Sequence, residues 1–139
     1  MKKLFQTYTL PRPFFKYNIP IAIQSCYLRD YAKKNNLSFS LPITEIVKKK
    51  SYFMFKKFFS KKKIDVILTS IFMLPLDDKK LLQKILKDVH NDTIFHFALE
   101  NLKLKKKAIF EWQKKYILIN RLSMSYKNLN LKTFRKNKN

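Results

Sequence analysis

The chain has 139 residues, of which 46% are hydrophobic and 15% aromatic. This length fits one domain, and the composition is too apolar for a chain that stays unfolded. No apolar run approaches the roughly 20 residues that cross a bilayer. The N-terminus (MKKLFQTY) turns polar too early for a signal peptide, so we expect a cytoplasmic protein.

The formal net charge is +22, a field that attracts nucleic acid, anionic lipid and phosphorylated ligands. All but four of the 31 basic residues are Lys, whereas specific phosphate and base contacts favour Arg. An AT-rich genome that fills solvated positions with Lys is therefore one interpretation, and a nucleic-acid surface is the other. Residues 51–63 (SYFMFKKFFSKKK) also allow two interpretations. Their aromatic side chains can stack on the bases of a nucleic acid, or they can form the buried face of a helix whose lysines are solvated.

The first 35 residues predict one strand followed by one helix. Residues 5–10 (FQTYTL) are rich in β-formers and stop at Pro11, which cannot continue a central strand. Pro20 suits the first turn of a helix, which we predict over residues 21–34. The residues expected on its buried face are Ile23, Tyr27 and Tyr31.

The middle of the chain predicts a short strand, a helix and a buried strand. Residues 37–42 (LSFSLP) are typical of the short strand, and Ser51 can cap a helix over residues 52–60. Residues 64–70 (IDVILTS) form a nearly continuous β-branched run, which is typical of a strand covered on both faces. We therefore place this strand at the centre of the sheet.

The rest of the chain predicts a helix, a strand and a long final helix. The third helix starts at Asp77 or Asp78, and residues 93–99 (TIFHFAL) predict the fourth strand. The final helix carries an apolar stripe that ends near Leu122, whereas residues 127–139 lack periodicity and predict a disordered basic tail. We therefore expect one α/β domain over residues 1–126.

Strands that alternate with helices predict right-handed βαβ units. The expected fold is a three-layer α/β structure whose four-stranded, mainly parallel sheet has the order 2-1-3-4 and helices on both faces, as in resolvase-like or flavodoxin-like folds. In such sheets, ligands bind beyond the carboxyl ends of the strands, where the strand order reverses. This rule places Arg12, Glu45, Ser70 and Glu100 at one edge of the sheet.

An arginine between two carboxylates can hold an anionic or hydroxyl-rich ligand while one glutamate exchanges a proton. Arg12 is accordingly a candidate phosphate or carboxylate ligand, and Glu45 and Glu100 are candidate general bases. The alternative is a structural ion pair between two loops. Further candidates for binding ligand hydroxyls or phosphate are Ser51, Tyr52 and Ser70, although ordinary N-capping is the alternative for the helix start.

Several common sites are excluded by composition. The chain has no Gly, which excludes a Walker A loop, a dinucleotide-binding glycine fingerprint and the usual nucleophile elbow. Cys26 is the only cysteine, so no internal disulfide can form. His90 and His96 lie in no metal-spaced motif, and we expect neither a metal nor a cofactor. The strand pattern predicts that His96 is a packed or hydrogen-bonded sheet histidine.

The chain resembles a known family over about residues 6–122. The similar stretches are residues 24–37 (QSCYLRDYAKKNNL), 41–45 (LPITE), 51–54 (SYFM), 64–75 (IDVILTSIFMLP) and 95–102 (FHFALENL). In order and spacing they resemble the sporadic carbohydrate cluster proteins. That resemblance implies a place in bacterial surface-polysaccharide biosynthesis, including lipopolysaccharide O-antigen loci, but it implies no particular reaction.

A fainter resemblance links the chain to the N-terminal catalytic domain of serine recombinases. It is carried by residues 29–37 (RDYAKKNNL) and by residues 64–75, and it implies the same sheet topology. The recombinase nucleophile is a Ser in the loop after the first strand, but residues 11–16 (PRPFFK) contain no Ser. Ser70 follows a different strand and cannot take that role, so DNA cleavage does not carry over.

Three functions follow as expectations. The first is a cytosolic protein of O-antigen, lipopolysaccharide or capsule biosynthesis that acts on or binds a sugar nucleotide or phosphorylated sugar. The second is a noncatalytic accessory subunit that binds another biosynthetic enzyme. The third is a basic nucleic-acid-binding module of recombinase-like shape without the nucleophilic serine.

Overall fold

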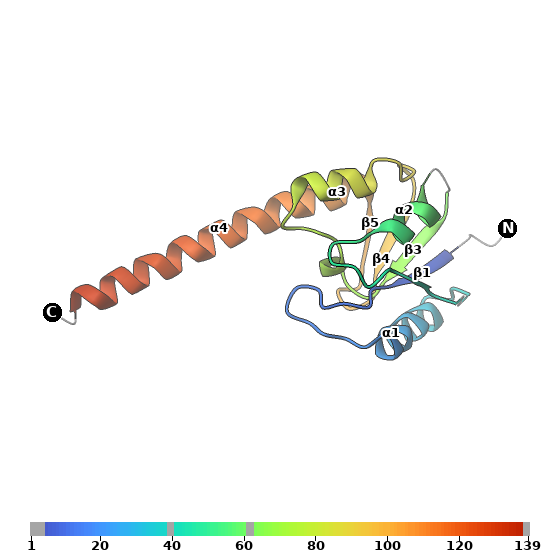
Figure 1. Cartoon of the computed structure of the whole chain (residues 1–139), viewed down its shortest axis with the longest axis horizontal. Coiled ribbons are helices and arrows are strands. Elements are labelled where there is room, and N and C mark those ends of the chain that lie inside the picture. The colour runs from blue at the N-terminus through green and yellow to red at the C-terminus, as the bar shows by residue number, and fades with distance from the viewer. Residues whose placement is uncertain (1–4, 39–40, 61–62, 138–139) are drawn as a thin grey trace.

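The computed structural model describes residues 5–38, 41–60 and 63–137, and it is an α/β fold with one mixed sheet (Figure 1). The strands are β1 (Phe5–Thr9), β2 (Ile43–Thr44), β3 (Asp65–Leu68), β4 (Ile94–Phe97) and β5 (Leu102–Lys105). The helices are α1 (Ile21–Lys34), α2 (Phe53–Phe59), the 3-10 turn η1 (Ile71–Met73), α3 (Lys79–Leu86) and α4 (Lys106–Asn137).

The strand order is β2-β1-β3-β4-β5, and the first four strands are parallel. The predicted order 2-1-3-4 is therefore confirmed, but the sheet has five strands rather than four. The fifth strand, β5, is antiparallel to β4, and Ile94 pairs with Lys105 at the far end of the ladder. It was missed because its four residues (LKLK) lead directly into α4 without a break. Asn101, with φ of 52°, forms the turn between these two strands.

The second strand lies later in the sequence than predicted. Leu41 and Pro42 are outside any strand, residues 39–40 lie outside the described residues, and β2 begins at Ile43. Proline has no N–H to give to a strand ladder, which explains why pairing starts after Pro42. The N–H of Glu45 donates to the carbonyl oxygen of Thr9 at 3.1 Å and extends the pairing by one residue.

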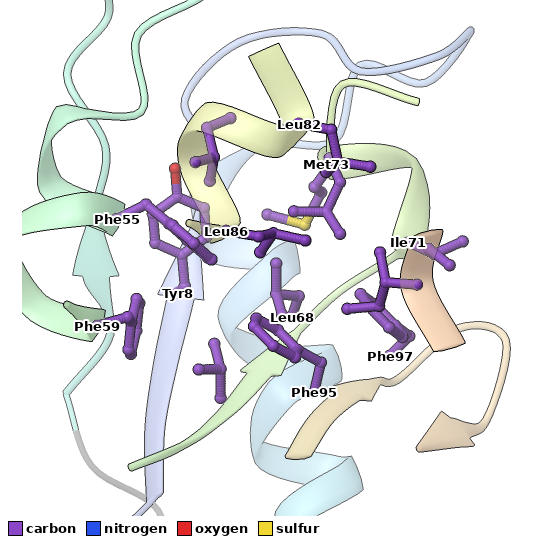
Figure 2. Close-up of a cluster of buried hydrophobic side chains, with 14 of the residues drawn as sticks. Tyr8, Phe55, Phe59, Leu68, Ile71, Met73, Leu82, Leu86, Phe95 and Phe97 are labelled. Carbon is purple, nitrogen blue, oxygen red and sulfur yellow. The ribbon is translucent and has the colours of Figure 1, made fainter. Parts of the chain in front are cut away.

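One face of the sheet carries the main hydrophobic core, which α2, α3 and the start of α4 cover (Figure 2). The two buried phenylalanines of α2, Phe55 and Phe59, pack against Tyr8 with ring centroids 5.3 and 6.4 Å away. Phe55 also stacks on Phe95 of β4. The central strand β3 is buried along its whole length, as its β-branched run predicts.

Helix α1 covers the opposite face, and its bounds agree with the prediction, but its buried face does not (Figure 1). Ile23 and Tyr27 are 46% and 43% exposed, whereas Tyr31 is buried as expected. Gln24 is buried instead, because its amide side chain accepts from the N–H of Leu10 at 3.0 Å and donates to the carbonyl of the same residue at 2.8 Å. A polar side chain with these partners can be buried at little cost.

Helix α4 starts against the core and extends away from the sheet (Figure 1). Ile109 is fully buried, while Ile119 and Leu122 are 63% and 62% exposed, so only the first part of the predicted stripe packs on the domain. The expected disordered tail over 127–139 falls within the last part of α4, apart from residues 138–139, which lie outside the described residues. None of the helices in the described residues is both long and apolar enough to span a membrane.

Candidate functional site

A crevice of about 240 Å³ opens beyond the carboxyl ends of β1 and β3. The sheet order reverses between these two strands, because the chain runs from β1 to β2 on one side and to β3 on the other. The wall residues come from the segment after β1, the loop before α2, the segment after β3 and the start of α3. They are Leu10, Arg12, Pro13, Phe14, Phe15, Lys49, Lys50, Tyr52, Phe72, Met73, Leu74, Pro75, Asp77, Asp78 and Leu81.

Arg12 ties the loop before α2 to the exit of β1. Its guanidinium donates to the carbonyl oxygens of Lys48 at 3.2 Å and Ser51 at 2.8 Å, with a longer 3.4 Å contact to that of Ile46. The same group lies 4.9 Å from the centroid of the Tyr52 ring, a cation–π arrangement. The loop between Ile46 and Ser51 is therefore held at the crevice by one side chain.

Glu45 lies beneath this loop and is 3% exposed. Both carboxylate oxygens accept from the N–H of Met54, at 3.1 and 2.8 Å. Burial raises the pKa of Glu45, while the N–H of Met54 and the charge of Arg12 oppose that rise. Glu45 thus accepts a hydrogen bond from a backbone N–H group in the first turn of α2. At this helix start the sequence predicted capping by Ser51. That prediction is wrong, since the N-cap residue is Tyr52 and the Ser51 hydroxyl is 3.5 Å from the N–H of Phe53.

Ser70 and Glu100 form a separate pair that joins the exit of β3 to the turn after β4. The Ser70 hydroxyl donates to Oε1 of Glu100 at 2.8 Å and accepts from the N–H of Phe72 at 3.1 Å. The N–H of Ile71 donates to the same carboxylate oxygen. These contacts fix the η1 turn, whose residue Phe72 lines the crevice.

The structure therefore divides the predicted site residues into groups. Arg12 and Tyr52 line the crevice, whereas Glu45, Ser70 and Glu100 are not among its wall residues. Among the described residues, no hydrogen bond or ion pair joins Arg12 to either glutamate. The alternative predicted from the sequence, a structural ion pair of Arg12 with a glutamate, is therefore not formed. The carboxylates of Glu45 and Glu100 accept hydrogen bonds from backbone N–H groups instead.

Lys49, Lys50 and Phe15 are wall residues that the sequence did not identify. The signal for the lysines was present, since the run at residues 48–50 directly precedes a helix at the predicted sheet edge. In sequence, however, such a run is indistinguishable from a solvated loop. Phe15 is brought to the crevice by a tight turn in which Phe14 and Tyr17 exchange two backbone hydrogen bonds of 3.0 and 2.9 Å.

Two further cavities adjoin the crevice, and we call the three together the trough. One, of about 290 Å³, shares Lys49, Lys50, Tyr52 and Leu81 with the crevice. The other, of about 330 Å³, shares the wall residues Phe15, Phe72, Leu74 and Asp77. The three cavities of the trough therefore lie next to one another past the carboxyl ends of β1 and β3.

A larger cavity of about 420 Å³ lies beside α1 and the end of β4. Its charged wall residues, Asp30 and Lys34, already pair with each other at 3.0 Å. Tyr31 also lines it, but the hydroxyl of this residue is bonded to Nδ1 of His96 at 2.9 Å, which makes His96 the hydrogen-bonded sheet histidine that was predicted. Because its lysine is already neutralised, this cavity is the weaker candidate for an anion.

The described residues include no group of three or more His, Cys, Asp and Glu side chains that could hold a metal ion. No protein-family model, curated protein or solved structure matches this chain. The candidate site is therefore defined by its own geometry. It is a crevice at the point where the strand order reverses, and its charged wall residues are Arg12, Lys49, Lys50, Asp77 and Asp78.

Proposed function

We propose that this protein binds a phosphorylated ligand, a sugar nucleotide or a phosphosugar, in the crevice beyond β1 and β3. One observation carries the proposal: the loop fixed by Arg12 brings Lys49 and Lys50 to a cavity at the reversal of the strand order. Parallel α/β sheets bind ligands at this position. Ammonium groups that line a cavity attract phosphate, and the charge of +22 adds to that attraction.

The biological setting we propose is the biosynthesis of a bacterial surface carbohydrate, such as an O-antigen, a lipopolysaccharide or a capsule. This part rests on the resemblance of the sequence to the sporadic carbohydrate cluster proteins. Sugar nucleotides and phosphosugars are the activated forms of sugar that such a setting supplies. Both carry the phosphate that the crevice lysines would bind.

The proposed activity is binding without a chemical step. Glu45 and Glu100, the two candidate general bases, are not wall residues of the crevice. Their carboxylates accept hydrogen bonds from the backbone N–H groups of Met54 and Ile71. A general base must reach the proton that it removes, and these contacts direct both groups toward loops instead.

Isothermal titration calorimetry with uridine diphosphate glucose and with glucose 1-phosphate tests the proposal. The variant is Lys49→Gln/Lys50→Gln, because both side chains are exposed. Loss of a charge-assisted phosphate contact should raise the dissociation constant at least about tenfold. Arg12→Ala is a poorer test, since it also releases three backbone carbonyls of the loop.

The matched control is Lys114→Gln/Lys115→Gln on α4, which removes the same charge from two exposed residues that line none of the three cavities. We expect it to change the affinity less than twofold. Equal losses in both variants would show that bulk charge alone attracts the ligand. That result, or no binding of either compound by the unmodified chain, would contradict the proposal.

A further inference from the structure

The two ends of the trough differ in chemistry. The cavity on one side of the crevice has five lysines in its wall, Lys48, Lys49, Lys50, Lys56 and Lys84, and its described wall includes no Asp or Glu. They come from the loop before α2, from α2 itself and from α3. Five lysines in the wall of one cavity of about 290 Å³ carry like charges that repel one another, and a ligand with more than one phosphate charge offsets that repulsion.

The opposite end of the trough is aromatic. Phe15, Phe72 and Tyr116 line this cavity, which measures about 330 Å³. The Phe15 ring stacks on Phe72 with centroids 4.4 Å apart, and Phe72 and Tyr116 form a T-shaped pair with centroids 5.9 Å apart. Phe15 nevertheless remains 52% exposed. An aromatic ring that is held on one side and open on the other is a platform for a nucleobase.

Unusual backbone conformations occur at both ends. Four non-glycine residues of the described chain have positive φ, and two of them, Asn36 and Asn101, are of the type that tolerates it. The other two are Phe15, with φ of 56°, and Lys50, with φ of 59°. Each lines the trough, Phe15 at the aromatic end and Lys50 at the basic end. Such conformations persist where surrounding contacts hold them, and they concentrate at ligand-binding sites.

The middle of the trough contains Asp77, which lines both the crevice and the aromatic cavity. Its carboxylate repels phosphate but accepts hydrogen bonds from hydroxyl groups. The cavity with five lysines is therefore followed by the crevice with Asp77 and then by the aromatic cavity, whose wall also includes one lysine, Lys16. A nucleotide has the matching order of phosphates, ribose hydroxyls and base.

From this order we infer that the ligand is a nucleoside diphosphate compound rather than a simple phosphosugar. Its diphosphate lies over Lys56 and Lys84, and its base lies on Phe15. The inference rests on the proposed function, because both end cavities share wall residues with the crevice of Lys49 and Lys50. It adds the class of ligand and its direction in the trough.

The test measures the affinity of the full chain for uridine diphosphate, uridine monophosphate and inorganic pyrophosphate by calorimetry. Phe15→Leu removes the aromatic face and keeps an apolar side chain, so it should weaken uridine diphosphate about tenfold, as expected for one stacked base, and leave pyrophosphate unchanged. Lys56→Gln/Lys84→Gln should weaken uridine diphosphate and pyrophosphate about tenfold or more, because each loses charge-assisted contacts, and uridine monophosphate by less.

Other outcomes separate the inference from the proposed function. If Phe15→Leu weakens the binding of uridine diphosphate and of pyrophosphate equally, or weakens neither, the base does not lie on Phe15 and the inference is wrong. If Lys49→Gln/Lys50→Gln abolishes binding of glucose 1-phosphate while Lys56→Gln/Lys84→Gln has no effect on uridine diphosphate, the crevice function stands and the diphosphate assignment fails. If no phosphorylated compound depends on Lys49 and Lys50, the proposed function itself fails.

Discussion

The hydrophobic core and the trough are built from the same helices, whose buried apolar side chains form the core and whose lysines line the trough, and Ile85 of α3 belongs to both. In α2, Phe55 and Phe59 point into the core, whereas Lys56 lines the trough. In α3, Leu82 is buried in the core and Lys84 is exposed at the trough. Helical spacing places Lys56 about 100° from Phe55 around α2 and Lys84 about 200° from Leu82 around α3. Stability and ligand binding can therefore be changed one at a time by mutation.

The largest expected effect is on the core side of this comparison. Phe95 is fully buried on β4 and stacks between Phe55 and Phe97. Phe95→Ala should lower the free energy of unfolding by about 3–5 kcal/mol, because it removes buried surface and leaves a cavity. Urea denaturation followed by circular dichroism measures this change. A loss below about 1 kcal/mol would mean that the core is not packed as described.

Glu45 lies at the boundary between core and trough and gives a smaller effect that depends on pH. Burial raises the pKa of Glu45, so the folded state holds this proton more tightly than the unfolded state does. Its contribution to stability is therefore greatest below the ordinary glutamate pKa, falls as pH rises through the raised value and is constant above it.

The variant Glu45→Gln does not titrate at this position and keeps an oxygen that can accept from the N–H of Met54. The stability of the unmodified chain relative to this variant should therefore decrease as pH rises from about 4 to 7. Urea denaturation of both chains across that range measures the difference. A relative stability that increases with pH would mean that the carboxylate is better stabilised in the folded protein than its burial implies.

The smallest expected effect on stability is on the trough side. Lys56→Gln/Lys84→Gln replaces two side chains with no described hydrogen bond or ion pair, so the free energy of unfolding should change by about 0.5 kcal/mol or less. Thermal denaturation and urea denaturation should agree on this result. A loss above about 2 kcal/mol would show that these lysines also support the fold. Stability and ligand binding could then not be changed separately at these positions.

The sequence predicted the parts of the fold that depend on local patterns. The bounds of α1, the burial of β3 and the start of α3 at Asp78 all agree with the structure. It did not predict the burial of Gln24, because that depends on the backbone of Leu10, which is distant in sequence. It also missed β5, whose four residues gain strand structure only by pairing with β4.

The position of the candidate site was predictable, but most of its chemistry was not. The topological rule led to the edge where Arg12 and Tyr52 lie, because that edge follows from the strand order alone. The partners of Glu45 and Glu100 depend on loop geometry, and these groups bond to backbone N–H groups rather than facing the crevice. The φ of Phe15 has no sequence signature, since phenylalanine rarely adopts it.

The most direct test of the proposed site is an NMR titration of the ¹⁵N-labelled chain with uridine diphosphate. Chemical-shift changes should be concentrated at the trough, at Phe15, Lys50 and Lys84, with none at Tyr27 and Asn101 beside α1. Changes at the α1 cavity, or changes spread evenly over the lysines of the surface, would contradict a ligand site beyond the ends of β1 and β3.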